Sequence, residues 1–424
     1  MSKIQENPEF IPSPEFLARS KRVDDALNLR QPDRIPIMLT LGYLLAEMGG
    51  ITRQELYDNP DKKQEILEKL AIHFQPDIVT GLFNTPSVSK ILGDRMTKWP
   101  GYGLGPDGSF QFDEKEFMKV EDYDALLHDP SDYAIRTYLP RVFSELEGLA
   151  LLPPLAISLF GFYATMNLSP LAAPPVMTAL EALKKAAQAM MLDVKHSMGS
   201  SQRLAKLGFP PAMFASGSMY EAPFDFMSDT LRSMRGIFLD MMRQPDKLLA
   251  AQEKVKRIMV DHAVAMVNST GMNTATLPLH RGSDGFMSIS QFERFYWPQL
   301  KDLLLQLIDV GIKPVVFYEG KWDERLEYLA ELPKGKTVGL FQSSDIFKVK
   351  EVLGDTMCII GGMSIPILTT GSVAQVREQT HEVCERVGKG GGFIMCTGIL
   401  ELEGCNPELV KTWVDATKEY GVYT

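Results

Sequence analysis

The chain has 424 residues, of which 45% are hydrophobic and 23% are charged, so it can bury a large core without disulfides. Its formal net charge of −10 argues against a nucleic-acid partner, because phosphate backbones are bound by clustered Lys and Arg. The start, MSKIQENPEFIPSPEF, has no apolar secretion segment, and no later stretch reaches the roughly 18 apolar residues of a membrane span. We therefore expect a soluble, cytoplasmic protein without a membrane partner.

Short apolar runs separated by helical patterns indicate repeated βα units around a parallel sheet. Eight such runs would close a (β/α)8 TIM barrel, preceded by an N-terminal helical extension. The predicted strands are, in chain order, Ile35–Leu39, Asp77–Leu82, Ala212–Ser216, Thr274–Leu279, Pro314–Tyr318, Thr337–Phe341, Met357–Gly361 and Gly392–Thr397. An additional run, Leu155–Phe160, competes with Ala212–Ser216 for the third place.

The regular spacing stops between about residues 100 and 210, where several prolines interrupt the pattern and a helix is predicted around Thr178–Lys206. We interpret this stretch as an insertion in a single barrel domain that spans residues 1–424. A long insertion of this kind is typical of a lid or an interface element.

The four cysteines, Cys358, Cys384, Cys396 and Cys405, lie near the C-terminal end without CxxC spacing. This pattern fits reduced thiols better than a disulfide framework. Most of them are expected to be small buried residues.

The chemistry of a barrel of this kind lies at the carboxyl ends of its strands, so polar and aromatic residues just past each run are the candidates. They are Asn84, Tyr220, Glu221, His280, Tyr318, Glu319, Gln342 and Cys396. Glu319 is the sharpest candidate, because a carboxylate directly after a buried strand must face the barrel mouth or pair with a base such as Lys321. His280 fits a metal ligand or a proton donor, with a hydrogen bond inside its loop as the alternative.

Several blocks of the sequence resemble the uroporphyrinogen decarboxylase superfamily. The blocks are Arg19–Ile37, Gln75–Val79, Arg235–Leu248, Ser283–Pro298, Gly391–Ile394, Asn406–Val410 and Lys418–Gly421. Porphyrinogen decarboxylases carry an Arg-rich run after the first strand, whereas Met38–Glu47 contains no Arg to hold substrate carboxylates. The resemblance therefore favours the corrinoid-dependent methyltransferase branch, which includes the methyltransferase I components of O-demethylases.

On that branch, members that methylate coenzyme M hold zinc with a His-x-Cys pair after the fifth strand and a Cys after the eighth. Here Phe317 and Glu319 stand at the first site, and either Cys396 or the turn Thr397-Gly398-Ile399 stands at the second. A thiol acceptor is therefore not expected. The resemblance implies transfer of a methyl group from a methylated substrate, such as an aryl methyl ether, to the cobalt of a corrinoid protein.

Cleavage of an ether requires an acid or a metal ion near an apolar slot. Glu319, His280 and Cys396 could hold a metal ion, with zinc as one option, or Glu319 could act with Tyr318 as an acid alone. Substrate contacts are expected from Phe83, Asn84, Phe162, Tyr163, Tyr220, Glu221 and Gln342. The corrinoid cofactor should arrive on a partner protein, because the sequence lacks the Asp-x-His-x-x-Gly run of corrinoid carriers.

Two other functions stay open at this point. One is decarboxylation of a smaller acid, for which Arg281 is the candidate carboxylate ligand. The other is a noncatalytic partner of a corrinoid protein. The sequence also leaves open a homodimer.

Overall fold

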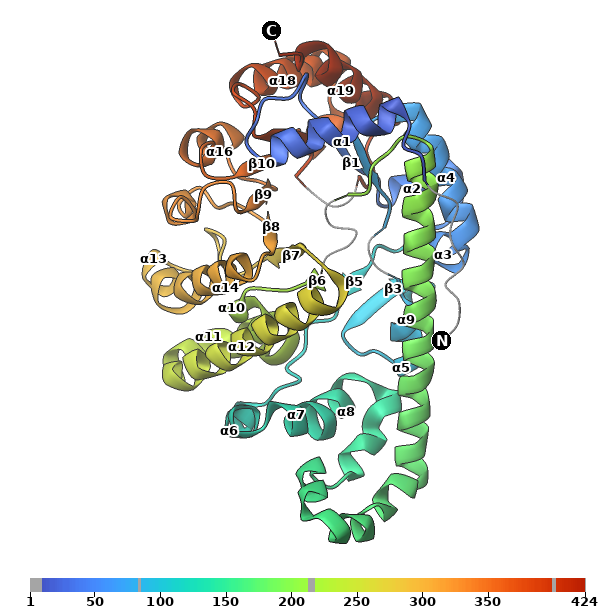
Figure 1. The fold of residues 1–424 in the computed structure, drawn as a ribbon, viewed down its shortest axis with the longest axis vertical. Coiled ribbons are helices and arrows are strands. Elements are labelled where there is room, and N and C mark those ends of the chain that lie inside the picture. The colour runs from blue at the N-terminus through green and yellow to red at the C-terminus, as the bar shows by residue number, and fades with distance from the viewer. Residues whose placement is uncertain (1–9, 83–84, 213–217, 399–401, 424) are drawn as a thin grey trace.

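The computed structural model describes residues 10–82, 85–212, 218–398 and 402–423, without the side chains of residues 160, 162–164 and 166–167. Parallel strands form a curved wall at the centre, and helices surround it on the outside (Figure 1). No helix in these described ranges is long and apolar enough to cross a membrane.

Eight parallel strands follow one another around the wall, as the (β/α)8 barrel requires. They are β1 (Met38–Thr40), β2 (Ile78–Thr80), β6 (Ser218–Met219), β7 (Thr274–Leu279), β8 (Lys313–Tyr318), β9 (Val338–Phe341), β10 (Cys358–Gly362) and β11 (Phe393–Cys396). The strands β6 to β11 pair in chain order, β1 pairs with β2, and a parallel bridge between Ile37 and Met395 joins β1 to β11. The predicted fold class is confirmed.

The sequence left two candidate runs for the third strand. The competing run Leu155–Phe160 is not a strand but lies in a 3-10 helix, η4 (Leu155–Asn167), where Leu159 is 87% exposed. Strand β6 takes the third place instead, directly after the predicted run Ala212–Ser216. Of that run, Ala212 is buried and residues 213–217 lie outside the described part of the chain.

Alternate residues of several strands enter two different cores. In β8, Val315 and Phe317 join a cluster inside the barrel, whereas Val316 and Tyr318 pack between the strands and the outer helices. The interior cluster is closed at one end by α1 (Pro14–Leu27), which contributes Ala26.

Buried ion pairs fasten α1 to the barrel. Arg22 and Arg34 contact the carboxylate of Asp77 at 2.6 and 2.7 Å, and Asp77, with a side chain that is 0% exposed, also accepts the N–H of Ile37. The conspicuous N-terminal sequence block is therefore structural, because it closes the end of the barrel opposite the strands' carboxyl ends.

Helices cover the outside of the strands. They are α2 (Leu44–Gly49), α3 (Arg53–Asp58), α4 (Pro60–Phe74), α10 (Pro223–Asp225), η6 (Phe226–Arg232), α11 (Ser233–Arg243), α12 (Pro245–Thr270), α13 (Ile289–Gln291), η7 (Phe292–Tyr296), α14 (Trp297–Asp309), α15 (Leu326–Leu329), α16 (Ile346–Leu353), α17 (Ile365–Thr370), α18 (Val373–Arg386) and α19 (Pro407–Tyr420). Of these, η6 and η7 are π-helical.

The stretch between β2 and β6 forms a helical arm with a small sheet. Its elements are α5 (Ser87–Leu92), β3 (Thr97–Pro100), β4 (Gly103–Leu104), β5 (Gln111–Phe112), η1 (Val120–Asp122), α6 (Tyr123–His128), α7 (Pro130–Tyr133), η2 (Ala134–Tyr138), α8 (Leu139–Val142), η3 (Ser144–Leu151), η4, η5 (Ser169–Ala172) and α9 (Pro174–Lys206). The predicted helix around Thr178–Lys206 is confirmed as the long helix α9, which runs along one edge of the molecule (Figure 1).

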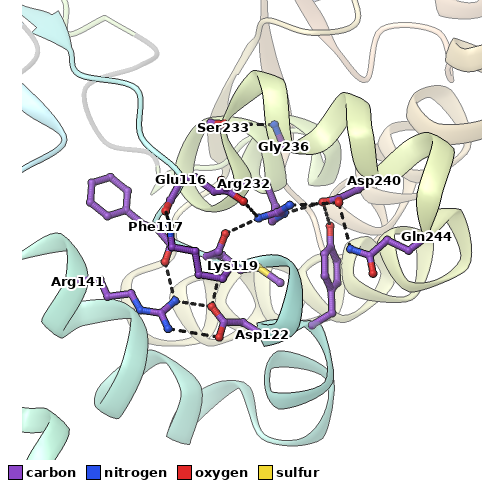
Figure 2. Close-up of polar contacts among 12 residues, drawn as sticks. Glu116, Phe117, Lys119, Asp122, Arg141, Arg232, Ser233, Gly236, Asp240 and Gln244 are labelled. Atoms are coloured by element: carbon purple, nitrogen blue, oxygen red, sulfur yellow. Dashed lines mark hydrogen bonds and ion pairs between the residues drawn. The ribbon is translucent and has the colours of Figure 1, made fainter.

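A buried charge network joins this arm to the barrel. Figure 2 shows the guanidinium of Arg232, which donates to Asp240 at 2.6 Å and to the carbonyl of Met118 at 2.6 Å, and also pairs with Glu116. The hydroxyl of Tyr123 donates to Asp240 at 2.8 Å. Because Arg232 is the last residue of η6, the network fixes the position of that π-helix.

Candidate active site at the carboxyl ends of the strands

His280 is the centre of a hydrogen-bonded chain of side chains. Its Nδ1 lies 2.5 Å from Asp229 Oδ2, and its Nε2 lies 3.2 Å from Glu319 Oε1. His280 and Glu319 are adjacent because β7 and β8 pair with Leu279 beside Tyr318, so the first residue past each strand meets the other. Asp229 comes from η6, which lies between β6 and β7 in the sequence.

The two carboxylates keep His280 protonated. Burial alone would lower the pKa of His280, but its hydrogen bonds with Asp229 and Glu319 outweigh burial and raise the pKa to about 11. Burial also acts on Asp229, yet the hydrogen bond and charge of His280 lower the pKa of that carboxyl. His280 is therefore an imidazolium at neutral pH, hydrogen-bonded to Asp229 on one side and to Glu319 on the other.

Asp225 positions the backbone of this chain. Its two carboxylate oxygens accept the N–H groups of His280 and Arg281, each at 2.9 Å, and the Tyr296 hydroxyl at 2.6 Å. Burial raises the pKa of Asp225 to about 6. Because Asp225 accepts both backbone N–H groups, it fixes the first two residues of the loop after β7 and so the position of the His280 ring relative to the strands.

Glu221, just after β6, is a further ionisable group close to Asp225, Asp229 and His280. We call these four residues the His280 cluster. Burial, followed by the charges of Asp229 and Asp225, raises its pKa to about 7. Its Oε2 atom is buried and has no hydrogen-bond partner within the described residues. Glu221 therefore holds a proton below neutral pH and becomes negative above it.

Arg281 is fully engaged by its neighbours. It contacts Asp229 at 2.7 Å and Ser228 at 3.1 Å, and Glu114 lies 3.8 Å away. The guanidinium balances Asp229 and is not presented as a free cation to an incoming carboxylate.

The loop that carries Glu319 is held at three points. The Glu319 N–H donates to the carbonyl of Leu279 at 3.2 Å, and the Trp322 ring donates to the carbonyl of Glu319 at 2.8 Å. The N–H of Gly320 donates to the side chain of Gln342 at 2.6 Å. Lys321 pairs with Asp323 and not with Glu319, so the salt bridge considered for Glu319 does not form.

A cavity of about 590 Å³ opens at the carboxyl ends of β9, β10 and β11, and Gln342 forms part of its wall. The remaining lining is mixed, with apolar side chains at Ile346, Phe347 and Met363 and polar ones at Ser364 and Gln379. This volume lies in the usual range for small-molecule sites. Because Gln342 also binds Gly320, the cavity lies next to the Glu319 loop.

Two predicted site residues point away from the mouth. Tyr318 is fully buried between the strands and the helices, stacked on Phe341 at 4.7 Å. Tyr220 is buried against α12, where its hydroxyl lies 3.0 Å from His262. Strand alternation directs the Tyr318 side chain outward, and Tyr220, one residue past β6, packs against α12. Neither side chain faces the mouth, so the structure gives no support to the predicted roles of Tyr318 in catalysis and of Tyr220 in the pocket wall.

The predicted metal ligands do not fit a zinc ion. Cys396 is fully buried among apolar side chains inside the barrel and is not grouped with His280 and Glu319. Both ring nitrogens of His280 are bound to carboxylates. No group of three or more His, Cys, Asp or Glu side chains in the described ranges is arranged to hold a metal.

Four predicted substrate contacts cannot be placed. Phe83 and Asn84 lie outside the described residues, as do the side chains of Phe162 and Tyr163 in η4. The structure does bring together His280, Glu319, Gln342 and, through its electrostatic coupling, Glu221.

Sequence reasoning missed Asp225, Asp229 and Tyr296. The available signal was the spacing of four from Glu221 to Asp225 and from Asp225 to Asp229, which places carboxylates on one face of a helix directly after a strand. Nothing in the local sequence pointed to Tyr296, which lies in η7.

Comparisons with known proteins agree with this architecture. The sequence model of the family described as Uroporphyrinogen decarboxylase (URO-D) matches residues 163–420, which is more than half of the chain. A solved structure, "methyltransferase from Methanosarcina mazei", matches with a TM-score of 0.57 at 16% identity, over 95% of this chain and 98% of that one, and so shares the fold. No curated protein matches the sequence at a significant level. Since the family match includes β6 to β11 and the His280 cluster, this chain belongs to the uroporphyrinogen decarboxylase family.

Proposed function

We propose that the protein is a methyltransferase that moves a methyl group from a methyl ether, such as an aryl methyl ether, to the cobalt of a partner corrinoid protein. The observation that carries the proposal is the series of hydrogen bonds from Asp229 through His280 to Glu319. Gln342, which binds the backbone next to Glu319, also lines the cavity past β9 to β11.

Ether cleavage needs a proton at the leaving oxygen. Attack on the methyl carbon breaks the bond from that carbon to the ether oxygen. Phenolate is a poor leaving group unless its oxygen is protonated as the bond breaks. His280 carries that proton at neutral pH, and Glu319 is the more exposed partner at 36% against 27% for His280. A substrate oxygen that approaches Glu319 would receive the proton of His280 Nε2, directly or through the carboxylate.

Asp229 and Asp225 act as positioning residues in this scheme. Asp229 fixes the ring through Nδ1, and Asp225 fixes the backbone on which the ring is carried. Neither needs to touch the substrate. Such support keeps a proton donor within reach of a bound substrate.

The cavity supports a small aromatic donor. Its volume of about 590 Å³ and its apolar side chains, among them Phe347 and Met363, suit a ring, and Gln342 offers a polar contact at the side of Glu319. A thiol acceptor is less suited, because neighbouring carboxylates raise the pKa of a thiol and reduce the thiolate fraction.

Decarboxylation of a small acid has less support. A substrate carboxylate needs a free cation, but Arg281 is already paired with Asp229, and the cluster is rich in acidic groups. A noncatalytic partner of a corrinoid protein would not require the organised proton donor described above.

The test is visible spectroscopy of the purified chain with a partner corrinoid protein reduced to Co(I). Methoxylated aromatic compounds should produce methyl-Co(III), whereas the reverse assay should give little methylation of coenzyme M. Efficient thiol methylation without ether cleavage would overturn the proposed direction. Absence of methyl transfer with every methylated donor and acceptor would favour the noncatalytic alternative.

A further inference from the structure

We propose that α9 is an antiparallel homodimerisation helix, pairing with α9 of a second copy through an exposed apolar stripe. The proposal does not depend on the reaction. It rests on the spacing, exposure and charge of residues 177–198.

The stripe lies about a third of a turn around the helix from the face by which α9 packs on its own chain. The packed face uses Val176, Ala179, Ala182 and Ala186, which join a cluster with the helix η3. Met190 and Leu192 are exposed on α9 outside the stripe, whose apolar residues are Met177, Leu180, Ala187, Met191, Val194 and Met198. Five of these are between 38% and 73% exposed, and Ala187 is also exposed.

The spacing of the stripe is that of a coiled coil. With Lys184 included, the residues of the stripe follow one another in steps of three and four, as do the a and d positions of a heptad. At the α-helical rise of about 1.5 Å per residue, the stripe is about 30 Å long. Helix α9 runs along one side of the molecule, where its upper half overlaps α2 to α4 and its lower half extends away from the barrel strands (Figure 1). A second helix can therefore lie along it without displacing the barrel.

The charged residues beside the stripe favour an antiparallel pairing of α9 with α9 of a second copy. When Leu180 faces Met198 of the other copy, Ala187 faces Met191 and the flanking Glu181 meets Lys195, twice by symmetry. Within the described part of one chain, Glu181 forms a surface ion pair with Lys184 at 3.3 Å. In the parallel direction Lys184 would meet its own copy inside the apolar seam, which is unfavourable.

The first experiment measures the molar mass of the full chain in solution by light scattering and sedimentation at micromolar concentration. We expect a dimer, and Met191→Glu should raise its dissociation constant by at least about 100-fold, because each dimer would bury two unpaired carboxylates. The matched control is Met242→Glu, which alters a methionine that is 81% exposed on α11 and should leave the dimer intact.

A charge swap tests the direction. Glu181→Lys and Lys195→Glu should each weaken the dimer, by about fivefold for flanking ion pairs, and the double variant should restore it. Oxidation adds a second readout, since the native cysteines are all buried. Gln188→Cys should crosslink across the antiparallel axis, whereas Ala187→Cys would crosslink in a parallel pair.

A monomer at these concentrations would overturn the proposal. So would a dimer that is unaffected by Met191→Glu, or a charge swap without rescue. If α9 variants instead abolish binding of the corrinoid protein to a monomeric chain, the stripe serves that partner and the homodimer is wrong.

Discussion

Glu319 lies where the chain leaves β8, bonded through its carboxylate to His280 and free of the neighbouring Lys321. Glu319→Gln should lower methyl transfer by about 100-fold or more, the usual scale for a proton-transfer group, and leave the melting temperature unchanged. The matched control is Glu324→Gln in the same loop, at a side chain that is 67% exposed, which should retain activity. Equal turnover in both variants would make Glu319 a structural residue.

Glu221 should give the reaction its pH dependence. Its raised pKa of about 7 keeps it neutral below that pH and negative above it. The new charge holds the His280 proton more tightly, so the rate should fall as the pH rises through 7. Glu221→Gln should remove this fall while keeping most of the activity measured near pH 6.

Rate profiles of both proteins between pH 5.5 and about 8.5, within the range where such groups titrate, provide the check. A wild-type profile retained in Glu221→Gln would assign the titration to another group. Glu324→Gln is again the control, because its side chain is on the surface and should leave the profile unchanged.

At the scale of elements, the π-helix η6 depends on the buried pair of Arg232 and Asp240, whose side chains are 3% and 2% exposed. Arg232→Met should lower the free energy of unfolding by about 3–5 kcal/mol, because it leaves Asp240 buried without its cation. Adding Asp240→Asn should recover part of the loss.

Denaturant unfolding measures this effect against a surface control. Arg257→Met removes an exposed ion pair with Glu253 and should cost no more than about 1 kcal/mol. Similar losses for Arg232→Met and Arg257→Met would show that the network in Figure 2 is not a main support of η6.

At the scale of the whole molecule, the purified chain should contain no corrinoid. The sequence lacks the Asp-x-His-x-x-Gly run that holds cobalt from below in carrier domains, and the proposed reaction takes its corrinoid from a partner protein. Visible absorption and cobalt analysis of the chain as isolated are the measurements. Stoichiometric cobalt with a corrinoid spectrum would contradict the expectation.

Much of the barrel could be predicted because its signal is local. Thr274–Leu279 was predicted to the residue as β7, since an apolar run bounded by polar residues specifies a buried strand. The run Leu155–Phe160 is also apolar but forms part of η4, in the arm outside the barrel. Only the tertiary arrangement separates these two outcomes.

The candidate site divides in the same way. The sequence by itself identified His280 and Glu319, because the ends of adjacent parallel strands must meet at one face of the sheet. Only the tertiary structure decided which side chains contact His280. Asp229 lies 51 residues away in sequence, and its contact with His280 sets the protonation state on which the proposed chemistry depends.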